Sequence, residues 1–179
     1  MAGNILYIPL SIIILTVLLI AAVVVRVKKG KIALRKFLLI CLPAFLVLQV
    51  YFWNHAVNNY VKSFLFPSKT FTCNYKEDMK NLHIPLPKRT VFHGKEDGCS
   101  PFYTTYADIG EITSFYEEEL QIMKNRNEIL NYHSIERDSG YWAEEKGFIL
   151  ELLSGAEVEV IIYRRNETDR WTIKINGNE

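Results

Sequence analysis

Two apolar stretches near the N-terminus constrain this chain most. They cover about residues 5–25 and 37–57. As helices rising 1.5 Å per residue, each is long enough to cross a hydrocarbon core of about 30 Å. The eleven residues between them, 26–36, contain six lysines and arginines and no acidic residue. The pattern predicts a transmembrane hairpin in residues 1–57 with a basic loop at its turn.

The basic loop also predicts the orientation of the hairpin. Short loops that are rich in lysine and arginine stay in the cytoplasm, so we expect both termini to be extracytoplasmic in a multi-pass protein of the cell membrane. A cleaved signal peptide is the alternative for the first stretch. Such a peptide carries its positive charges before its apolar core. Here no lysine or arginine precedes Ile5, so we expect an anchor in the lipid bilayer.

Beyond the hairpin, the composition becomes that of a water-soluble protein. We expect residues 58–84 to be a membrane-proximal connector and residues 85–179 to be one small extracytoplasmic domain, which is long enough to bury its own core. The net charge of +1 is a balance between the basic hairpin and a glutamate-rich stretch at 108–159. No basic stripe with interleaved aromatic residues suggests nucleic acid as a partner.

The periodicity of the soluble part predicts one helix and six strands. The helix starts at Asp108, which forms a capping box with Glu111. One apolar face follows at helical spacing: Ile109, Ile112, Phe115, Tyr116, Leu120 and Met123. Strand-like segments cover 89–93, 101–106, 132–136, 148–153, 158–163 and 171–175. Two strands, a helix and four strands predict an α+β domain, an antiparallel sheet with one packed helix.

The run from Tyr106 to Leu120 reads Tyr-Ala-Asp-Ile-Gly-Glu-Ile-Thr-Ser-Phe-Tyr-Glu-Glu-Glu-Leu. With the strands around it, this run resembles small extracytoplasmic domains of bacterial membrane proteins and lipoproteins. Those domains share a tyrosine-bearing strand, an acidic cap, a Phe-Tyr-x-x-x-Leu helix and a sheet. The resemblance covers about residues 85–176. It implies the fold and the extracytoplasmic compartment of a bacterial protein, and it implies no catalytic residues.

Cys73 and Cys99 are the two cysteines of the soluble part. Disulfides form outside the cytoplasm, so we predict a bond between them. Two free thiols are one alternative. A zinc site with His83 and His93 is another, but no two of these four residues have the spacing of two to four residues that zinc fingers use. We therefore expect no metal.

The sequence contains no recognisable nucleophile–base pair, metal-ligand spacing or phosphate-binding loop. We therefore expect no catalytic residues and no cofactor. Tyr141 and Trp142 lie beside Glu144 and Glu145, and aromatic side chains in a loop can bind a sugar or a peptide. These four residues are the predicted binding site. The leading hypothesis is an interaction or sensing domain that binds a protein, a peptide or an envelope component.

Two other functions stay open at this point. One is a membrane-anchored hydrolase with its site around His93, His133, Tyr141 and Trp142. The other is an accessory subunit of a membrane complex that assembles through the hairpin. A buried histidine or carboxylate with a shifted pKa in a deep pocket would favour the hydrolase. A flat sheet face or an exposed apolar patch would favour the binding domain.

Overall fold

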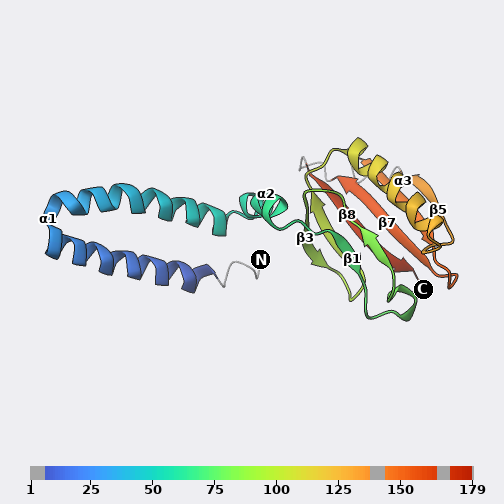
Figure 1. The fold of residues 1–179 in the computed structure, drawn as a ribbon, viewed down its shortest axis with the longest axis horizontal. Coiled ribbons are helices and arrows are strands. Elements are labelled where there is room, and N and C mark those ends of the chain that lie inside the picture. Colours follow the sequence, from blue (N-terminus) through green and yellow to red (C-terminus); the bar gives the residue numbers. More distant parts are fainter. Residues whose placement is uncertain (1–6, 138–143, 165–169, 179) are drawn as a thin grey trace. The chain divides into compact units, whose positions relative to one another are not determined.

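The computed structural model describes residues 7–137, 144–164 and 170–178, which form two compact units, Met1–Val61 and Lys62–Glu179 (Figure 1). Within these described ranges the fold is α+β, with three α-helices and a six-stranded antiparallel sheet. In chain order the elements are α1 (Tyr7–Trp53), α2 (His55–Leu65), β1 (Thr70–Thr72), a 3-10 turn η2 (Glu77–Met79), β2 (His83–Pro85), β3 (Thr90–Lys95), β4 (Pro101–Thr105), α3 (Ile109–Asn125), β5 (Asn131–Arg137), β6 (Glu144–Glu151), β7 (Glu157–Arg164) and β8 (Trp171–Asn178).

Among the described residues, α1 is the one helix that is long and apolar enough to cross a membrane. The sequence predicted two such helices, and the structure has one candidate of 47 residues. An apolar helix near the N-terminus fits a membrane anchor or a signal sequence. Residues 26–36, predicted as a loop, are helical except at Gly30, whose φ is 79° and ψ is −176°. Glycine adopts such angles without a steric penalty, and its lysine, alanine and leucine neighbours favour helix.

The chain reverses direction at Gly30 within α1. The rings of Tyr7 and Phe52 are 5.2 Å apart, and Ser11 Oγ donates a 2.9 Å hydrogen bond to Gln49 Oε1. Trp53 Nε1 donates to the same oxygen, also at 2.9 Å. A straight helix of this length would separate its ends by about 70 Å. The two halves of α1 therefore lie side by side (Figure 1).

The half-buried side chains of α1 recur every three or four residues, which is the spacing of one helix face. They include Tyr7, Ser11, Ile14, Leu18, Ala21, Val25, Ala33, Phe37, Cys41, Phe45 and Gln49. Most other side chains of α1 are exposed and apolar. The contact between the halves thus covers one side of each half and leaves the remaining apolar surface open.

The six-stranded sheet has the strand order β3-β4-β8-β7-β6-β5. β3 and β4 form a hairpin, and α3 then connects β4 to the opposite edge of the sheet. From that edge, β5 to β8 run back as a meander, so the last strand pairs with β4. All six predicted strands are present, and the predicted antiparallel sheet is confirmed.

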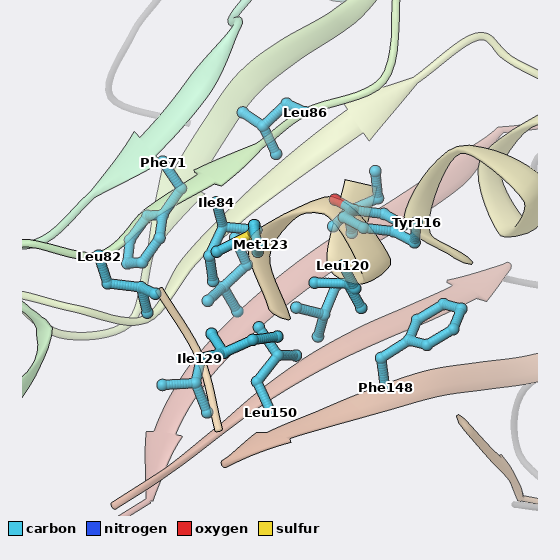
Figure 2. Close-up of a cluster of buried hydrophobic side chains, with 14 of the residues drawn as sticks. Phe71, Leu82, Ile84, Leu86, Tyr116, Leu120, Met123, Ile129, Phe148 and Leu150 are labelled. Atoms are coloured by element: carbon cyan, nitrogen blue, oxygen red, sulfur yellow. The ribbon is translucent and has the colours of Figure 1, made fainter. Parts of the chain in front are cut away.

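The main core lies between α3 and the sheet (Figure 2). The capping box starts α3 as predicted: Gly110 N donates to Asp108 Oδ2 at 3.3 Å, and Asp108 N donates to Glu111 Oε2 at 3.4 Å. The helix buries Ile112, Tyr116, Leu120 and Met123. The sheet contributes buried side chains from β6, β7 and β8: Phe148, Leu150, Val158, Val160, Ile162, Ile173 and Ile175. Full burial of each such side chain stabilises the fold by about 1.5–3 kcal/mol.

The segment from Thr70 to Leu86, most of it in the predicted connector, contributes to the same core. It buries Phe71, Leu82, Ile84 and Leu86 (Figure 2), and also Met79. Its β1 and β2 pair with each other rather than with the large sheet. Lys76 Nζ donates to the Gly177 carbonyl at 3.0 Å, and a Cβ at position 177 would come within 2.6 Å of the Met79 sulfur. Glycine at the end of β8 therefore lets this segment pack closely.

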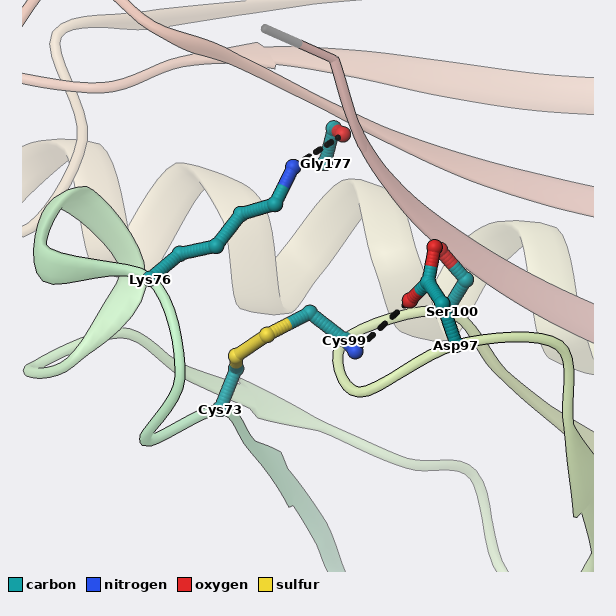
Figure 3. The surroundings of a disulfide bond; sticks show 6 residues. All are labelled: Cys73, Lys76, Asp97, Cys99, Ser100 and Gly177. Atoms are coloured by element: carbon teal, nitrogen blue, oxygen red, sulfur yellow. Dashed lines mark hydrogen bonds between the residues drawn. A yellow bond between two sulfur atoms is a disulfide. The ribbon is translucent and has the colours of Figure 1, made fainter.

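The predicted disulfide between Cys73 and Cys99 is confirmed, with 5.4 Å between the two Cα atoms (Figure 3). It joins the segment after β1 to the turn between β3 and β4, and both cysteines are buried. Beside it, the Asp97 carboxylate accepts hydrogen bonds from Cys99 N at 2.8 Å and Ser100 Oγ at 3.0 Å. These bonds hold the pKa of Asp97 below its ordinary value.

Replacing Leu120 tests the core between α3 and the sheet. Leu120→Ala is expected to lower the free energy of unfolding by about 2–5 kcal/mol, because it leaves a cavity under a fully buried side chain. Glu118→Ala, on the exposed face of the same helix, should change it by less than about 0.5 kcal/mol. Urea unfolding of the full-length protein in detergent, followed by near-ultraviolet circular dichroism, measures both. Equal losses of unfolding free energy in the two variants would mean that the buried face of α3 has been assigned to the wrong side chains.

Removing the disulfide tests its contribution to stability. The double variant Cys73→Ala, Cys99→Ala is expected to lose about 2–4 kcal/mol of unfolding free energy, because the open chain has more unfolded-state entropy. Cys41→Ala, in α1, is the matched control and should leave the unfolding of the C-terminal unit unchanged. A double variant as stable as the parent protein would contradict the bond.

Candidate functional site

A groove of about 580 Å³ opens on the C-terminal unit. The end of α2, the residues before β1, the turn before β3 and the first turns of α3 meet around it. The apolar lining consists of Phe64, Pro67, Leu86, Pro87, Ala107 and Phe115, and the polar lining of Ser63, Ser68, Lys69, Lys88, Arg89 and Glu111. A groove of this size with mostly apolar walls and a few convergent polar groups is typical of a ligand-binding site.

Backbone hydrogen bonds hold the walls of the groove in place. Ser68 N donates to the Thr90 carbonyl at 2.7 Å, and Ser68 Oγ accepts from Phe92 N at 3.2 Å. Leu86 N donates to the Lys69 carbonyl at 2.9 Å. The residues before β1 are thus hydrogen-bonded both to β3 and to the segment after β2. The groove is built on a rigid frame.

Arg89 stands in an unusual backbone conformation at the base of β3. Its φ of 60° lies in the left-handed region, which costs a residue other than glycine on the order of 1 kcal/mol or more. Its guanidinium carbon lies 4.4 Å from the centre of the Phe64 ring and 5.5 Å from that of Tyr106. The guanidinium of Arg170 lies 5.2 Å from the same Tyr106 ring. Such cation–π contacts contribute about 0.5–2 kcal/mol each, so they help to offset the backbone strain.

The described residues that line the groove carry a positive net charge. Lys69 and Lys88 are exposed, Arg89 is half-buried, and Glu111 is the one acidic residue among the described lining residues. The Glu111 carboxylate accepts the capping-box hydrogen bond from Asp108 N. The lining thus has three cations and one carboxylate, and that carboxylate already accepts a hydrogen bond at the start of α3. This excess of positive charge favours an anionic ligand.

Phe115 lies on α3 at the edge of the buried stripe. It is half-buried and stacks edge-on against Tyr116 at 5.4 Å between ring centres, so it belongs partly to the core and partly to the groove. Tyr116 itself is fully buried, and burial raises its pKa far above the ordinary tyrosine value. Burial also raises the pKa of Tyr103 to about 12. Both phenols therefore stay neutral at physiological pH.

The predicted binding residues lie mostly beyond what the structure describes. Tyr141 and Trp142 are outside the described residues. Glu144 and Glu145 are in β6, where their backbones pair with Arg164 and Tyr163 of β7, and their side chains are outside the described part. The role of these four residues in binding stays a prediction.

The histidines of the hydrolase hypothesis are not brought together. His93 is on β3 and His133 on β5, the two opposite edges of the six-stranded sheet. Five strand spacings separate those edges, about 24 Å. His93 Nδ1 is 3.4 Å from Thr104 Oγ1. His133 lines a second hollow together with Lys124 and Tyr132, which form hydrogen bonds to Asn131 and Gln121.

The four residues considered for zinc have other surroundings. Cys73 and Cys99 are joined to each other, and His83 Nδ1 is 2.9 Å from the Asn81 carbonyl. Within the described ranges, no three His, Cys, Asp or Glu side chains converge as a metal site would require.

No protein-family model, curated protein or solved structure matches this chain. The candidate site therefore depends on geometry and chemistry. Sequence reasoning missed the groove, because its cations come from separate segments, Lys69 before β1 and Lys88 and Arg89 before β3. The available signal was the rigid Ile84-Pro85-Leu86-Pro87 run directly before two cations.

Proposed function

We propose that this protein is a membrane-tethered binding module whose C-terminal unit faces away from the cytoplasm. The observation that carries the proposal is the groove beside Arg89, which combines apolar walls with three cations on a rigid frame. A strained arginine held between two aromatic rings supports a functional role, because such strain persists where the surroundings enforce it, often at ligand sites.

We propose further that α1 anchors the protein by crossing the bilayer twice. Gly30 divides it into halves of about 23 residues, each roughly 35 Å long, which suits a hydrocarbon core of about 30 Å. The apolar side chains on the outer faces of both halves favour a lipid environment. The six cations around Gly30 favour a cytoplasmic turn and extracytoplasmic termini. The disulfide supports the same compartment for the C-terminal unit.

The binding role is favoured over the hydrolase. The described residues that line the groove include serine, lysine, arginine and glutamate, but no histidine or cysteine that could act as a base or a thiol nucleophile. The two histidines proposed for catalysis lie at opposite sheet edges. The proposal also agrees with the resemblance of residues 85–176 to extracytoplasmic domains of bacterial membrane proteins and lipoproteins.

Cysteine labelling tests the topology. In a Cys41→Ala background, Ser154→Cys places a reporter in an exposed turn between β6 and β7, and Lys29→Cys places one beside Gly30. A membrane-impermeant maleimide should label Ser154→Cys on intact cells, and Lys29→Cys only after permeabilisation. Labelling of both reporters from the same side would contradict two crossings. Labelling of Ser154→Cys only after permeabilisation would contradict the orientation.

Photo-crosslinking in living cells tests the groove as the binding site. Benzoylphenylalanine in place of Phe115 is expected to form an adduct of defined mass, because this ring lines the groove. The same residue in place of the exposed Tyr75 is the matched control. Lys69→Gln with Lys88→Gln should reduce the adduct from position 115 severalfold. An absence of adducts above the control level, or an adduct indifferent to the two lysines, would count against a binding role for the groove.

A further inference from the structure

We infer that the groove binds the phosphate-bearing headgroup of an anionic phospholipid from the bilayer in which α1 is anchored. The inference rests on the proposed function and names the ligand class of that same groove. Four observations support it: the position of the groove in the chain, the exposed apolar residues beside it, its charge and its size.

The α2 wall of the groove follows the apolar segment closely in the sequence. Asn54 Oδ1 accepts from the backbone N–H groups of Ala56 and Val57 at 3.0 and 3.2 Å, and Asn54 alone separates the end of α1 from the start of α2. Ser63 therefore comes ten residues after Trp53, and ten residues reach at most about 36 Å even when fully extended. If α1 spans the bilayer, the chain keeps this wall close to the lipid surface.

Large apolar side chains are exposed at the C-terminal end of α2. Phe64, Leu65 and Phe66 are consecutive, and 56%, 64% and 75% of their surfaces are accessible. Pro67 follows and ends α2. An exposed run of this kind is unfavourable in water, whereas the membrane interface accommodates aromatic and aliphatic side chains. Phe64 also contributes to the groove, so the apolar run and the ligand site are continuous.

The cations of the groove suit a phosphate diester. Lys69 and Lys88 provide two exposed ammonium groups, and Arg89 provides a planar guanidinium held by Phe64 and Tyr106. Lysine acts as a mobile point charge, and arginine presents several N–H donors in a fixed plane. An anionic headgroup complements this set, whereas the net charge of a zwitterionic headgroup is zero.

The size and walls of the groove suit a lipid rather than a folded partner. A volume of about 580 Å³ holds a headgroup and the first carbons of its chains. Leu86, Pro87 and Phe115 offer apolar contact for the glycerol and acyl segments. The groove therefore suits a ligand that has an anionic part and an apolar part and that is present at a membrane surface. An anionic phospholipid has all three properties.

Crosslinking to defined lipids tests this inference on the full-length protein. The protein carrying benzoylphenylalanine in place of Phe115 is placed in nanodiscs of phosphatidylcholine alone, or of phosphatidylcholine with one third phosphatidylglycerol. Mass spectrometry of the peptide that contains position 115 gives the ratio of the two lipid adducts. Because this readout is local to the groove, lipid held by the basic residues around Gly30 does not contribute to it.

We expect phosphatidylglycerol adducts to exceed their bulk share severalfold. Lys69→Gln with Lys88→Gln should return the ratio towards the bulk value, because these two lysines supply much of the attraction for the anionic headgroup at low salt. Lys80→Gln with Lys124→Gln removes two exposed lysines elsewhere on the unit and should leave the ratio unchanged. Soluble glycerol phosphate, added to both kinds of nanodisc, distinguishes a free anion from a lipid: we expect it neither to form adducts nor to reduce the phosphatidylglycerol adducts.

An adduct ratio equal to the bulk ratio would overturn the inference, as would a preference that survives loss of the groove lysines or is abolished by the control pair. Competition by glycerol phosphate would point to a soluble anion instead. These results differ from failure of the proposed function. If position 115 captures a peptide or protein in cells but no anionic lipid in nanodiscs, the binding module stands and its lipid ligand does not.

Discussion

Packing of α3 on one face of the sheet is the interaction on which the rest of the C-terminal unit depends. Ile112, Tyr116, Leu120 and Met123 insert into a surface of valine, isoleucine, leucine and phenylalanine side chains. This contact sets the rotation of the helix. The rotation in turn brings Glu111 and Phe115 to the groove, while Glu117 and Glu118 are exposed. A different helix phase would bury charge and remove one wall of the site.

A second layer of contacts extends the core to the segment before the sheet. Phe71 and Ile84 are the buried central residues of two short strands that are too small to be stable alone. Burial against the main core and the disulfide to Cys99 stabilise them. Their position brings Lys69 beside the Leu86–Arg89 turn, because Leu86 N donates to the Lys69 carbonyl, and both line the groove. The segment from Thr70 to Leu86, most of which was predicted as a connector, is therefore part of the C-terminal unit and of its core.

The functional proposals share one physical basis, which is whether each surface of the protein favours water or lipid as its environment. The outer faces of α1 are apolar, so water is a poor environment for them and lipid a good one. The run from Phe64 to Phe66 is apolar on a charged surface, which suits the boundary between lipid and water. The groove beside it adds cations to apolar walls, and a molecule with a charged head and an apolar body satisfies both.

How much of this could be predicted from the sequence depends on the range of each interaction. Asp108 and Glu111 predicted the start of α3, and alternation predicted the six strands, because capping and amphipathic periodicity act over a few residues. The apolar content of residues 5–57 likewise predicted a membrane segment, and the single pair of cysteines in the soluble part predicted the disulfide. Local patterns did not show that the chain stays helical around Gly30, or that Thr70–Leu86 joins the core. Above all, they did not show that Lys69, Arg89 and Phe115, which lie far apart in the sequence, share one groove. Only the tertiary structure decided this, because the strand order and the rotation of α3 depend on packing between distant segments.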